Sequence, residues 1–178
     1  MNGPATTLVL GGARSGKSRL GERIAHASGR QRVYIATAQP LDDEMTERIA
    51  RHRADRGDGW TTIDAPIDLA ATLRAEAAAS RILLVDCLTL WLTNVMLEER
   101  DVEADCAELA DAVKTIPTSL ILISNETGLG IVPDNALARR FRDAQGRLNQ
   151  MIAAVAPRVV FVAAGLPLAL KGDALDLS

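Results

Sequence analysis

The chain has 178 residues, of which 48% are hydrophobic and 24% charged, and its formal net charge is −3. These values are typical of a single globular domain over residues 1–178, and the acidic balance argues against a nucleic-acid partner, since such binders are usually basic. The two cysteines, Cys87 and Cys106, lack a metal-binding or redox spacing, and the N-terminal segment does not resemble a signal peptide. The longest apolar stretch, Val159–Leu170, contains a glycine and a proline and is too short for a membrane span. We therefore expect a cytoplasmic protein with no membrane span.

Short apolar runs alternate with longer amphipathic segments along the chain. Runs rich in valine, isoleucine and leucine predict buried strands at Thr7–Leu10, Val33–Ala36, Ile82–Asp86, Leu120–Ser124 and Val159–Ala163. The more polar run Trp60–Ile63 predicts an edge strand. Helices are predicted at Lys17–Ala27, Asp42–Arg56, Asp68–Ala79, Leu88–Glu98, Glu103–Lys114 and Asp134–Ala156. This alternation indicates an α/β fold with a mostly parallel sheet and helices on both of its faces.

The first predicted strand leads directly into a glycine-rich loop that matches G-x-x-x-x-G-K-[ST], the phosphate-binding P-loop. The loop consists of Gly11, Gly12, Ala13, Arg14, Ser15, Gly16, Lys17 and Ser18. Backbone N–H groups and the start of the following helix form an anion site there. Lys17 suits the β- and γ-phosphates, and the hydroxyl of Ser18 suits Mg²⁺. The alternative, an ordinary glycine turn, does not explain why lysine and serine follow in register, so we expect a nucleoside triphosphate to bind.

The next predicted helix carries one of the two histidines. Met45, Ile49, His52 and Arg56 share one face at helical spacing, so His52 points inward with an apolar stripe. On spacing alone, a structural interior histidine is favoured. The other interpretation is a nucleophile, with Arg48 and Arg56 binding a phosphate and holding the pKa of His52 low enough to keep it neutral.

Polar residues follow two of the predicted central strands. Asp86 comes after four apolar residues and would hold Mg²⁺ directly or through water at the carboxyl end of the sheet. Ser124-Asn125-Glu126 ends the next strand, where its polar groups would reach a substrate or metal, or make a helix cap or turn. The segment from Gly128 to Pro133 has two glycines and is typical of a mobile or tightly turned cover over a site.

The last predicted helix has the clearest apolar stripe. Asp134 is placed to cap it, directly after a proline. The stripe consists of Leu137, Phe141, Ala144, Leu148, Met151 and Val155. The other faces carry Arg139, Arg140, Arg142 and Arg147, which form either a solvated face or a contact with phosphate or another subunit.

Taken together, the motifs resemble one family, the bifunctional adenosylcobinamide kinase / adenosylcobinamide-phosphate guanylyltransferases of cobalamin biosynthesis. The resemblance extends from about Leu8 to Lys171. The motifs that carry it, besides the P-loop, are Tyr34-Ile35-Ala36-Thr37-Ala38, Asp42-Asp43-Glu44-Met45, Arg48-Ile49-x-x-His52, Asn125-Glu126-x-Gly128-x-Gly130-Ile131-Val132-Pro133 and Arg139-x-Phe141-Arg142-Asp143-x-x-Gly146-x-x-Asn149-Gln150.

The resemblance implies two reactions. A nucleoside triphosphate, ATP or GTP, phosphorylates the corrinoid adenosylcobinamide, and GTP then gives GMP to an enzyme histidine, from which adenosylcobinamide phosphate takes it. That histidine maps onto His52, which reverses the preference from spacing alone. The resemblance also implies a RecA-like P-loop NTPase fold and a homotrimer. Beyond the P-loop, the implied GTP contacts are Ala36, Thr37, Ala38, Arg53, Ala54, Asp55, Arg56, Asp64 and Asp86.

Two rival functions remain open from the residues themselves. One is a P-loop small-molecule kinase without guanylyltransferase activity, in which His52 is structural and forms no GMP adduct. The other is a non-catalytic nucleotide switch, which orders its loops on binding and turns over no corrinoid.

Overall fold

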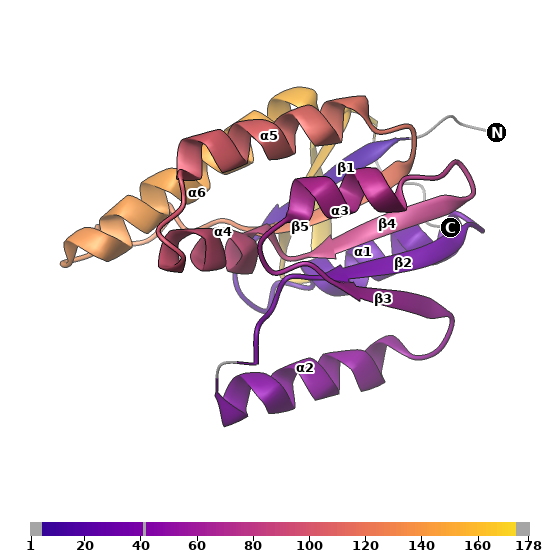
Figure 1. Ribbon diagram of the computed structural model, residues 1–178, viewed down its shortest axis with the longest axis horizontal. Coiled ribbons are helices and arrows are strands. Elements are labelled where there is room, and N and C mark those ends of the chain that lie inside the picture. The colour runs from indigo at the N-terminus through magenta and orange to yellow at the C-terminus, as the bar shows by residue number, and fades with distance from the viewer. Residues whose placement is uncertain (1–4, 41, 174–178) are drawn as a thin grey trace.

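The computed structural model describes residues 5–40 and 42–173, and in them one seven-stranded sheet runs through the molecule (Figure 1). The strand order is β3-β2-β4-β5-β1-β6-β7. The strands are β1 (Thr6–Gly11), β2 (Gln31–Ala36), β3 (Trp60–Asp64), β4 (Arg81–Asp86), β5 (Ser119–Asn125), β6 (Arg158–Ala163) and β7 (Leu166–Lys171). All neighbours are parallel except β7, which is antiparallel to β6. The mostly parallel sheet predicted from the sequence is confirmed.

Helices cover both faces of this sheet, as predicted. They are α1 (Lys17–Ala27), α2 (Asp43–Arg56), α3 (Leu69–Glu76), α4 (Leu88–Leu97), α5 (Val102–Thr115) and α6 (Ala136–Val155). One apolar cluster packs α3 to α6 against one face, and a smaller cluster packs α1 against the other. Successive strand residues enter opposite clusters, Leu8 the first and Val9 the second. Burial on both faces therefore explains why the strands are apolar without alternation.

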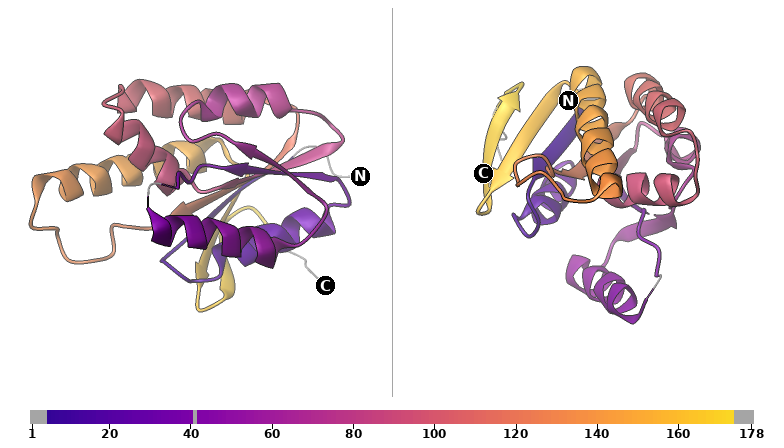
Figure 2. Two further views of the ribbon diagram at one scale, coloured as in Figure 1. Left: turned by 60° about the horizontal axis from the view of Figure 1, so that its bottom comes forward. Right: turned by 90° about the vertical axis from the view of Figure 1, so that its left-hand side faces the viewer.

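Helix α2 stands apart from the other helices, next to the edge strand β3 (Figures 1 and 2). It begins after Asp42, whose carboxylate accepts a hydrogen bond from the Met45 N–H at 2.7 Å, which is a standard N-cap. The predicted edge strand over Trp60–Ile63 is confirmed as β3, because only β2 pairs with it.

Two local features differ from the sequence-based expectations. Helix α6 begins at Ala136, and its cap is Asn135, which accepts from the Ala138 N–H at 2.7 Å, so the predicted cap at Asp134 is wrong. The guanidinium of Arg139 donates to the Asp134 carbonyl oxygen at 2.8 Å, just before the cap.

Strand β7 was not predicted, although its residues belong to the longest apolar stretch of the sequence. Ala164 and Gly165 both have positive φ, at 51° and 78°, and so make a two-residue turn that folds β7 back onto β6. The proline within β7 argues against a central strand, but β7 lies at the sheet edge, where an N–H is not needed. No helix in the described part of the chain is long and apolar enough to cross a membrane.

Candidate active site

The P-loop predicted from the sequence connects β1 to α1. Gly11 has φ 153° and lies so close to the Val162 carbonyl oxygen that an added Cβ would collide with it. Gly16, with φ 100°, is the residue before α1. The Gly165 N–H donates to the Ser15 carbonyl oxygen at 2.8 Å, so the turn between β6 and β7 supports the loop from outside. The glycines at both ends of the motif are therefore required by backbone conformation or close approach.

Lys17 lies over the loop that precedes it. Its side chain is largely buried, and Nζ donates to the Gly12 carbonyl oxygen at 2.5 Å. Burial lowers the pKa of Lys17, while the neighbouring Cys87 and Asp86 act in the opposite direction. A partly desolvated ammonium next to backbone N–H groups suits a highly charged anion such as a triphosphate.

Asp86 ends β4 and contacts groups from two other elements. Its side chain is 10% exposed, and Oδ2 accepts a hydrogen bond from the Tyr34 hydroxyl at 3.0 Å. The same oxygen lies 3.8 Å from Nε2 of His52 on α2. Burial and the charge of Asp86 raise the pKa of Tyr34, so this hydroxyl stays a donor. Asp86 therefore joins the sheet to α2, and its charge also reaches Lys17.

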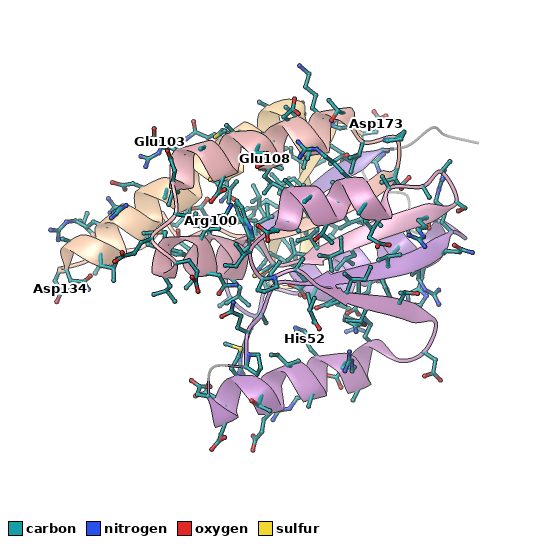
Figure 3. All side chains as sticks on the ribbon, in the orientation of Figure 1. His52, Arg100, Glu103, Glu108, Asp134 and Asp173 are labelled. Atoms are coloured by element: carbon teal, nitrogen blue, oxygen red, sulfur yellow. The ribbon has the colours of Figure 1, made fainter. Side chains whose placement is uncertain are left out.

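His52 faces the sheet from α2, as the helical spacing predicted, but it is not an interior residue. Its side chain is 44% exposed, and Figure 3 shows it on the side of α2 that faces the sheet. An open imidazole next to a carboxylate is available to a substrate, whereas a structural histidine would be enclosed.

Arg56, one turn further along α2, is buried and attaches the helix to the sheet. Its guanidinium carbon lies 3.4 Å from the centroid of the Tyr34 ring, and Nη2 donates to the Thr62 hydroxyl at 2.9 Å. Nε of Arg56 is buried without a partner among the described residues. Since Arg56 holds the same tyrosine that binds Asp86, it also fixes the position of α2 relative to that carboxylate. The predicted role of Arg48 lies outside the described residues, because its side chain is not placed.

The other predicted nucleotide contacts divide into two groups. Asp64, Ala36 and Asp86 are direct neighbours in register across β3, β2 and β4, so they form a row at the carboxyl edge of the sheet. Ala38 follows β2 at the same edge, while Arg53, Ala54 and Asp55 are exposed on α2. Thr37 is fully buried, and its hydroxyl binds the backbone of Cys87, donating at 2.7 Å and accepting at 2.8 Å. The hydroxyl of Thr37 is thus already used in joining β2 to the end of β4.

One residue of this region was missed by sequence reasoning. Glu22 on α1 is half-buried, and burial raises its pKa, with His52 acting against that shift and Asp86 in favour of it. Its carboxylate therefore shares a small charged cluster with the histidine and Asp86. No motif marks Glu22, and its spacing from Lys17 shows nothing about which charged groups of distant segments lie near it.

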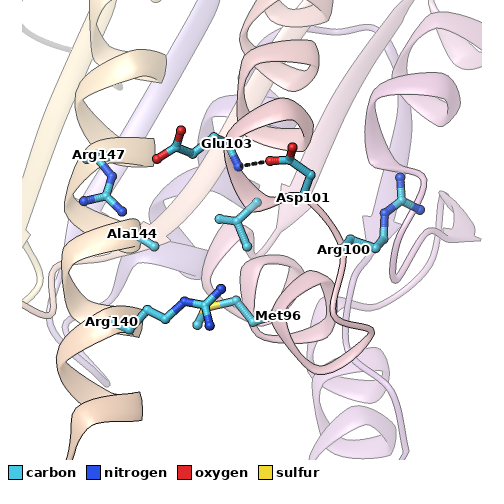
Figure 4. A pocket seen from close by; sticks show the side chains of 8 residues that line it. Met96, Arg100, Asp101, Glu103, Arg140, Ala144 and Arg147 are labelled. Atoms are coloured by element: carbon cyan, nitrogen blue, oxygen red, sulfur yellow. Dashed lines mark hydrogen bonds between the residues drawn. The ribbon is translucent and has the colours of Figure 1, made fainter.

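A separate pocket of about 260 Å³ lies where α6 passes the junction of α4 and α5 (Figure 4). It is lined by Met96, Arg100, Asp101, Val102, Glu103, Arg140, Ala144 and Arg147. None of the predicted site residues lines it. Two arginines of the predicted arginine-rich face of α6 point into this pocket, whereas Arg142 pairs with Asp143 at 2.9 Å on the surface.

Comparison with known proteins connects this geometry to one family. Residues 7–170 match the family described as cobinamide kinase / cobinamide phosphate guanyltransferase. The chain is 54% identical over 170 residues to the bifunctional adenosylcobalamin biosynthesis protein CobP of Pseudomonas aeruginosa, covering 94% of this chain and 98% of that one. It is 38% identical over 179 residues to the bifunctional adenosylcobalamin biosynthesis protein CobU of Escherichia coli, covering 92% and 98%.

Among solved structures, the RadB recombinase matches with a TM-score of 0.53 and 14% identity, over 89% of this chain and 74% of that one. At this identity the likeness concerns the fold alone. It confirms the predicted α/β P-loop fold with a RecA-like sheet.

Proposed function

The chain belongs to the cobinamide kinase / cobinamide phosphate guanyltransferase family, and we propose that both reactions use the site around the P-loop, with His52 as the residue that accepts GMP. The enzyme phosphorylates adenosylcobinamide with a nucleoside triphosphate. It then transfers GMP from GTP to adenosylcobinamide phosphate, which gives adenosylcobinamide-GDP for cobalamin biosynthesis. The intermediate, the residue roles and the metal are our proposals.

The observation that carries the role of His52 is its position. Nε2 lies 3.8 Å from Asp86, at the same sheet edge as the P-loop, and the ring is open to a substrate. Nε2 of the neutral imidazole would attack the α-phosphorus of GTP, forming a P–N bond while the bond to the β-phosphate oxygen breaks and pyrophosphate leaves. A phosphate oxygen of adenosylcobinamide phosphate would then attack the same phosphorus and release the histidine. Covalent catalysis of this kind replaces one difficult displacement by two easier ones.

The phosphoryl transfer depends on positioning and charge neutralisation, which Lys17 and the loop N–H groups supply. Ser18 and Asp86 fit Mg²⁺, because both offer oxygen ligands and Mg²⁺ is usually held by one or two carboxylates together with the phosphates. The described residues contain no cluster of three acidic, histidine or cysteine side chains that would suit a different, protein-enclosed metal. When bound, Mg²⁺ would neutralise charge on the phosphates.

The remaining expectations also stand as proposals. The row Asp64–Ala36–Asp86 and the exposed residues Arg53 to Asp55 would contact GTP. Either ATP or GTP would be the phosphate donor of the kinase reaction. The chain would act in the cytoplasm as a homotrimer. The support for the contacts of Asp64, Ala36 and Asp86 is their shared position at the carboxyl edge of the sheet, where α/β proteins bind ligands. Arg53 to Asp55 are exposed on the helix that carries His52.

Labelling with GTP tests the proposal directly. Incubation with α-labelled GTP and Mg²⁺, followed by denaturation, should leave an acid-labile, alkali-stable label on His52, as expected for a phosphoramidate. His52→Ala should abolish this label and retain the phosphorylation of adenosylcobinamide.

The matched control is His26→Ala, which removes the other histidine of the chain. His26 binds Arg32 at 2.7 Å and packs edge-on against Trp60, so its loss should leave the label intact. No label under conditions of demonstrated GTP binding would favour the kinase-only function. Equal loss of both activities in a folded His52→Ala protein would refute the division of roles, and absence of any corrinoid turnover would favour a nucleotide switch.

A further inference from the structure

Three buried polar side chains interrupt the apolar contact between β5 and α6. Ser124 and Gln145 are fully buried and Asn149 is 6% exposed; we call these three residues the buried triad. Gln145 Nε2 donates to Ser124 Oγ at 2.9 Å and to Asn149 Oδ1 at 3.0 Å, and Ser124 Oγ donates to Asn149 Oδ1 at 2.6 Å. Oε1 of Gln145 has no partner among the described residues. Burying an unsatisfied carbonyl is unfavourable, so the stability of the fold does not account for the amide group of Gln145.

The hydrogen bonds of the buried triad end at one peptide beside the P-loop. Asn149 Nδ2 donates to the Asn125 carbonyl oxygen at 3.1 Å, and the N–H of Asn125 donates to the Thr89 hydroxyl at 2.9 Å. Asn125 is opposite Gly11 in the strand register, and the next N–H, that of Glu126, donates to the Gly11 carbonyl oxygen at 3.0 Å. Thr89 on α4 and Asn149 on α6 thus bind the N–H and the carbonyl group of Asn125, which lies beside the first glycine of the P-loop.

The side chain of Asn125 lies on the P-loop side of the sheet. Along β5, Ile121 and Ile123 pack in the cluster with α1, while Ser124 turns to α6. Strand alternation therefore places the Asn125 side chain on the face of α1, one step beyond Ile123 towards the carboxyl edge. It is half-exposed, and no hydrogen bond to its amide occurs among the described residues. The backbone of Asn125 is held tightly while its amide remains available for a ligand.

We propose that Asn125 is a binding residue for the phosphoryl group in transfer, and that the buried triad acts as its positioning network. The amide NH₂ donates a hydrogen bond to an oxygen of that group, on the same face of the sheet as Lys17. Phosphoryl transfer gains rate chiefly from the positioning of reactants, and small displacements of a positioned group are costly. This inference rests on the kinase reaction and is independent of the role given to His52.

The test compares single and double variants in the phosphorylation of adenosylcobinamide. Asn125→Ala changes a half-exposed side chain and should lower kcat about 10- to 100-fold, with the nucleotide KM changed by less than about threefold. Gln145→Met keeps the side-chain volume and removes the polar group; it should lower kcat about 3- to 10-fold while the melting temperature stays the same or rises. Loss of rate without loss of stability is the result that a purely structural network would not produce.

The double variant shows whether Gln145 acts through Asn125. If it does, Gln145→Met should have almost no further effect on kcat in the Asn125→Ala protein, because residues that act in one network are non-additive. Ile152→Val is the matched control: it trims a buried apolar residue of α6, should lower the melting temperature by a few degrees, and should leave kcat unchanged.

Unchanged kcat in Asn125→Ala would overturn the proposal, and independent, multiplying effects in the double variant would overturn the positioning role. If Gln145→Met fails to fold, Ser124→Ala takes its place in the same cycle. Labelling of His52 by GTP, measured in parallel, reports on the guanylyltransferase proposal alone, so failure of one proposal is distinguishable from failure of the other.

Discussion

Replacing Arg56 by alanine should detach α2 from the sheet without unfolding the rest of the protein. Arg56 is the buried residue of α2 among those described, and the helix stands apart from the other helices (Figure 1). Its guanidinium stacks on Tyr34 and donates to Thr62. These two contacts therefore attach the C-terminal end of the helix that carries His52 to the sheet.

The magnitude follows from the contacts. A hydrogen bond from a charged donor contributes about 1.5–3 kcal/mol, and a largely desolvated cation–π contact about 1–2 kcal/mol. Against this, the buried Nε without a partner costs about 1–3 kcal/mol, which the alanine variant no longer has. Taking the middle of each range, the net loss of docking free energy is about 2 kcal/mol, and each 1.4 kcal/mol lowers the ratio of docked to undocked α2 about tenfold.

Hydrogen–deuterium exchange of the nucleotide-free protein measures this effect without interference from GTP contacts. Amides of α2 should exchange faster in Arg56→Ala, while those of β4 and β5 remain as in the wild type, and labelling of His52 by GTP should slow. Arg51→Ala is the matched control, since it removes the same charge from an exposed position on the same helix and should change little. Unchanged exchange of α2 in Arg56→Ala, or equal acceleration in Arg51→Ala, would refute the anchoring role.

Three further predictions concern the P-loop lysine, the cysteines and the core. Because burial lowers the pKa of Lys17, the folded protein releases this proton at lower pH than the unfolded chain does. The contribution of Lys17 to stability therefore rises as pH increases towards 10.5. Lys17→Met should keep or raise the melting temperature at pH 7, and nucleotide should no longer raise the melting temperature of this variant. Burial raises the pKa of Cys87 and of Cys106 to about 11, so iodoacetamide at pH 8 should modify neither thiol until the protein is unfolded, and modification of the native protein would contradict this. Leu148→Ala, at a fully buried position, should cost about 2–5 kcal/mol in urea denaturation, whereas Leu137→Ala, at a 65% exposed position of the same predicted stripe, should stay within about 0.5 kcal/mol.

Much of the architecture could be predicted from local patterns. Buried parallel strands need apolar side chains on both faces, so continuous apolar runs in the sequence predict them, as at Ile82–Val85 and Leu120–Ile123. The strand β7 could not be predicted in this way, because its exposed residues are apolar and its identity depends on pairing with β6 after a tight turn. Likewise, Leu137 fits the apolar stripe of α6 by spacing but is exposed, whereas the other residues of the stripe are buried in the core or packed against it.

The candidate site shows the same division. The P-loop was predictable because its residues are contiguous and each works through local backbone conformation. His52 was placed on the correct face of its helix, but spacing alone favoured an enclosed residue, and the sequence held no sign that α2 would stand apart from the other helices. Glu22 and Gln145 carry no motif, and each acquires its surroundings from a segment distant in the chain.

The sequence by itself thus determined the fold class, the nucleotide loop and, through its family motifs, the chemistry. Only the tertiary structure decided that His52 meets Asp86 at an open edge of the sheet, that Arg56 anchors α2 through Tyr34, and that a buried network ends at Asn125. The physical reason is the separation along the chain of the residues that interact. Backbone conformation and periodic burial are set by near neighbours in the chain, whereas the contacts that orient a catalytic group depend on which distant segments pack against it.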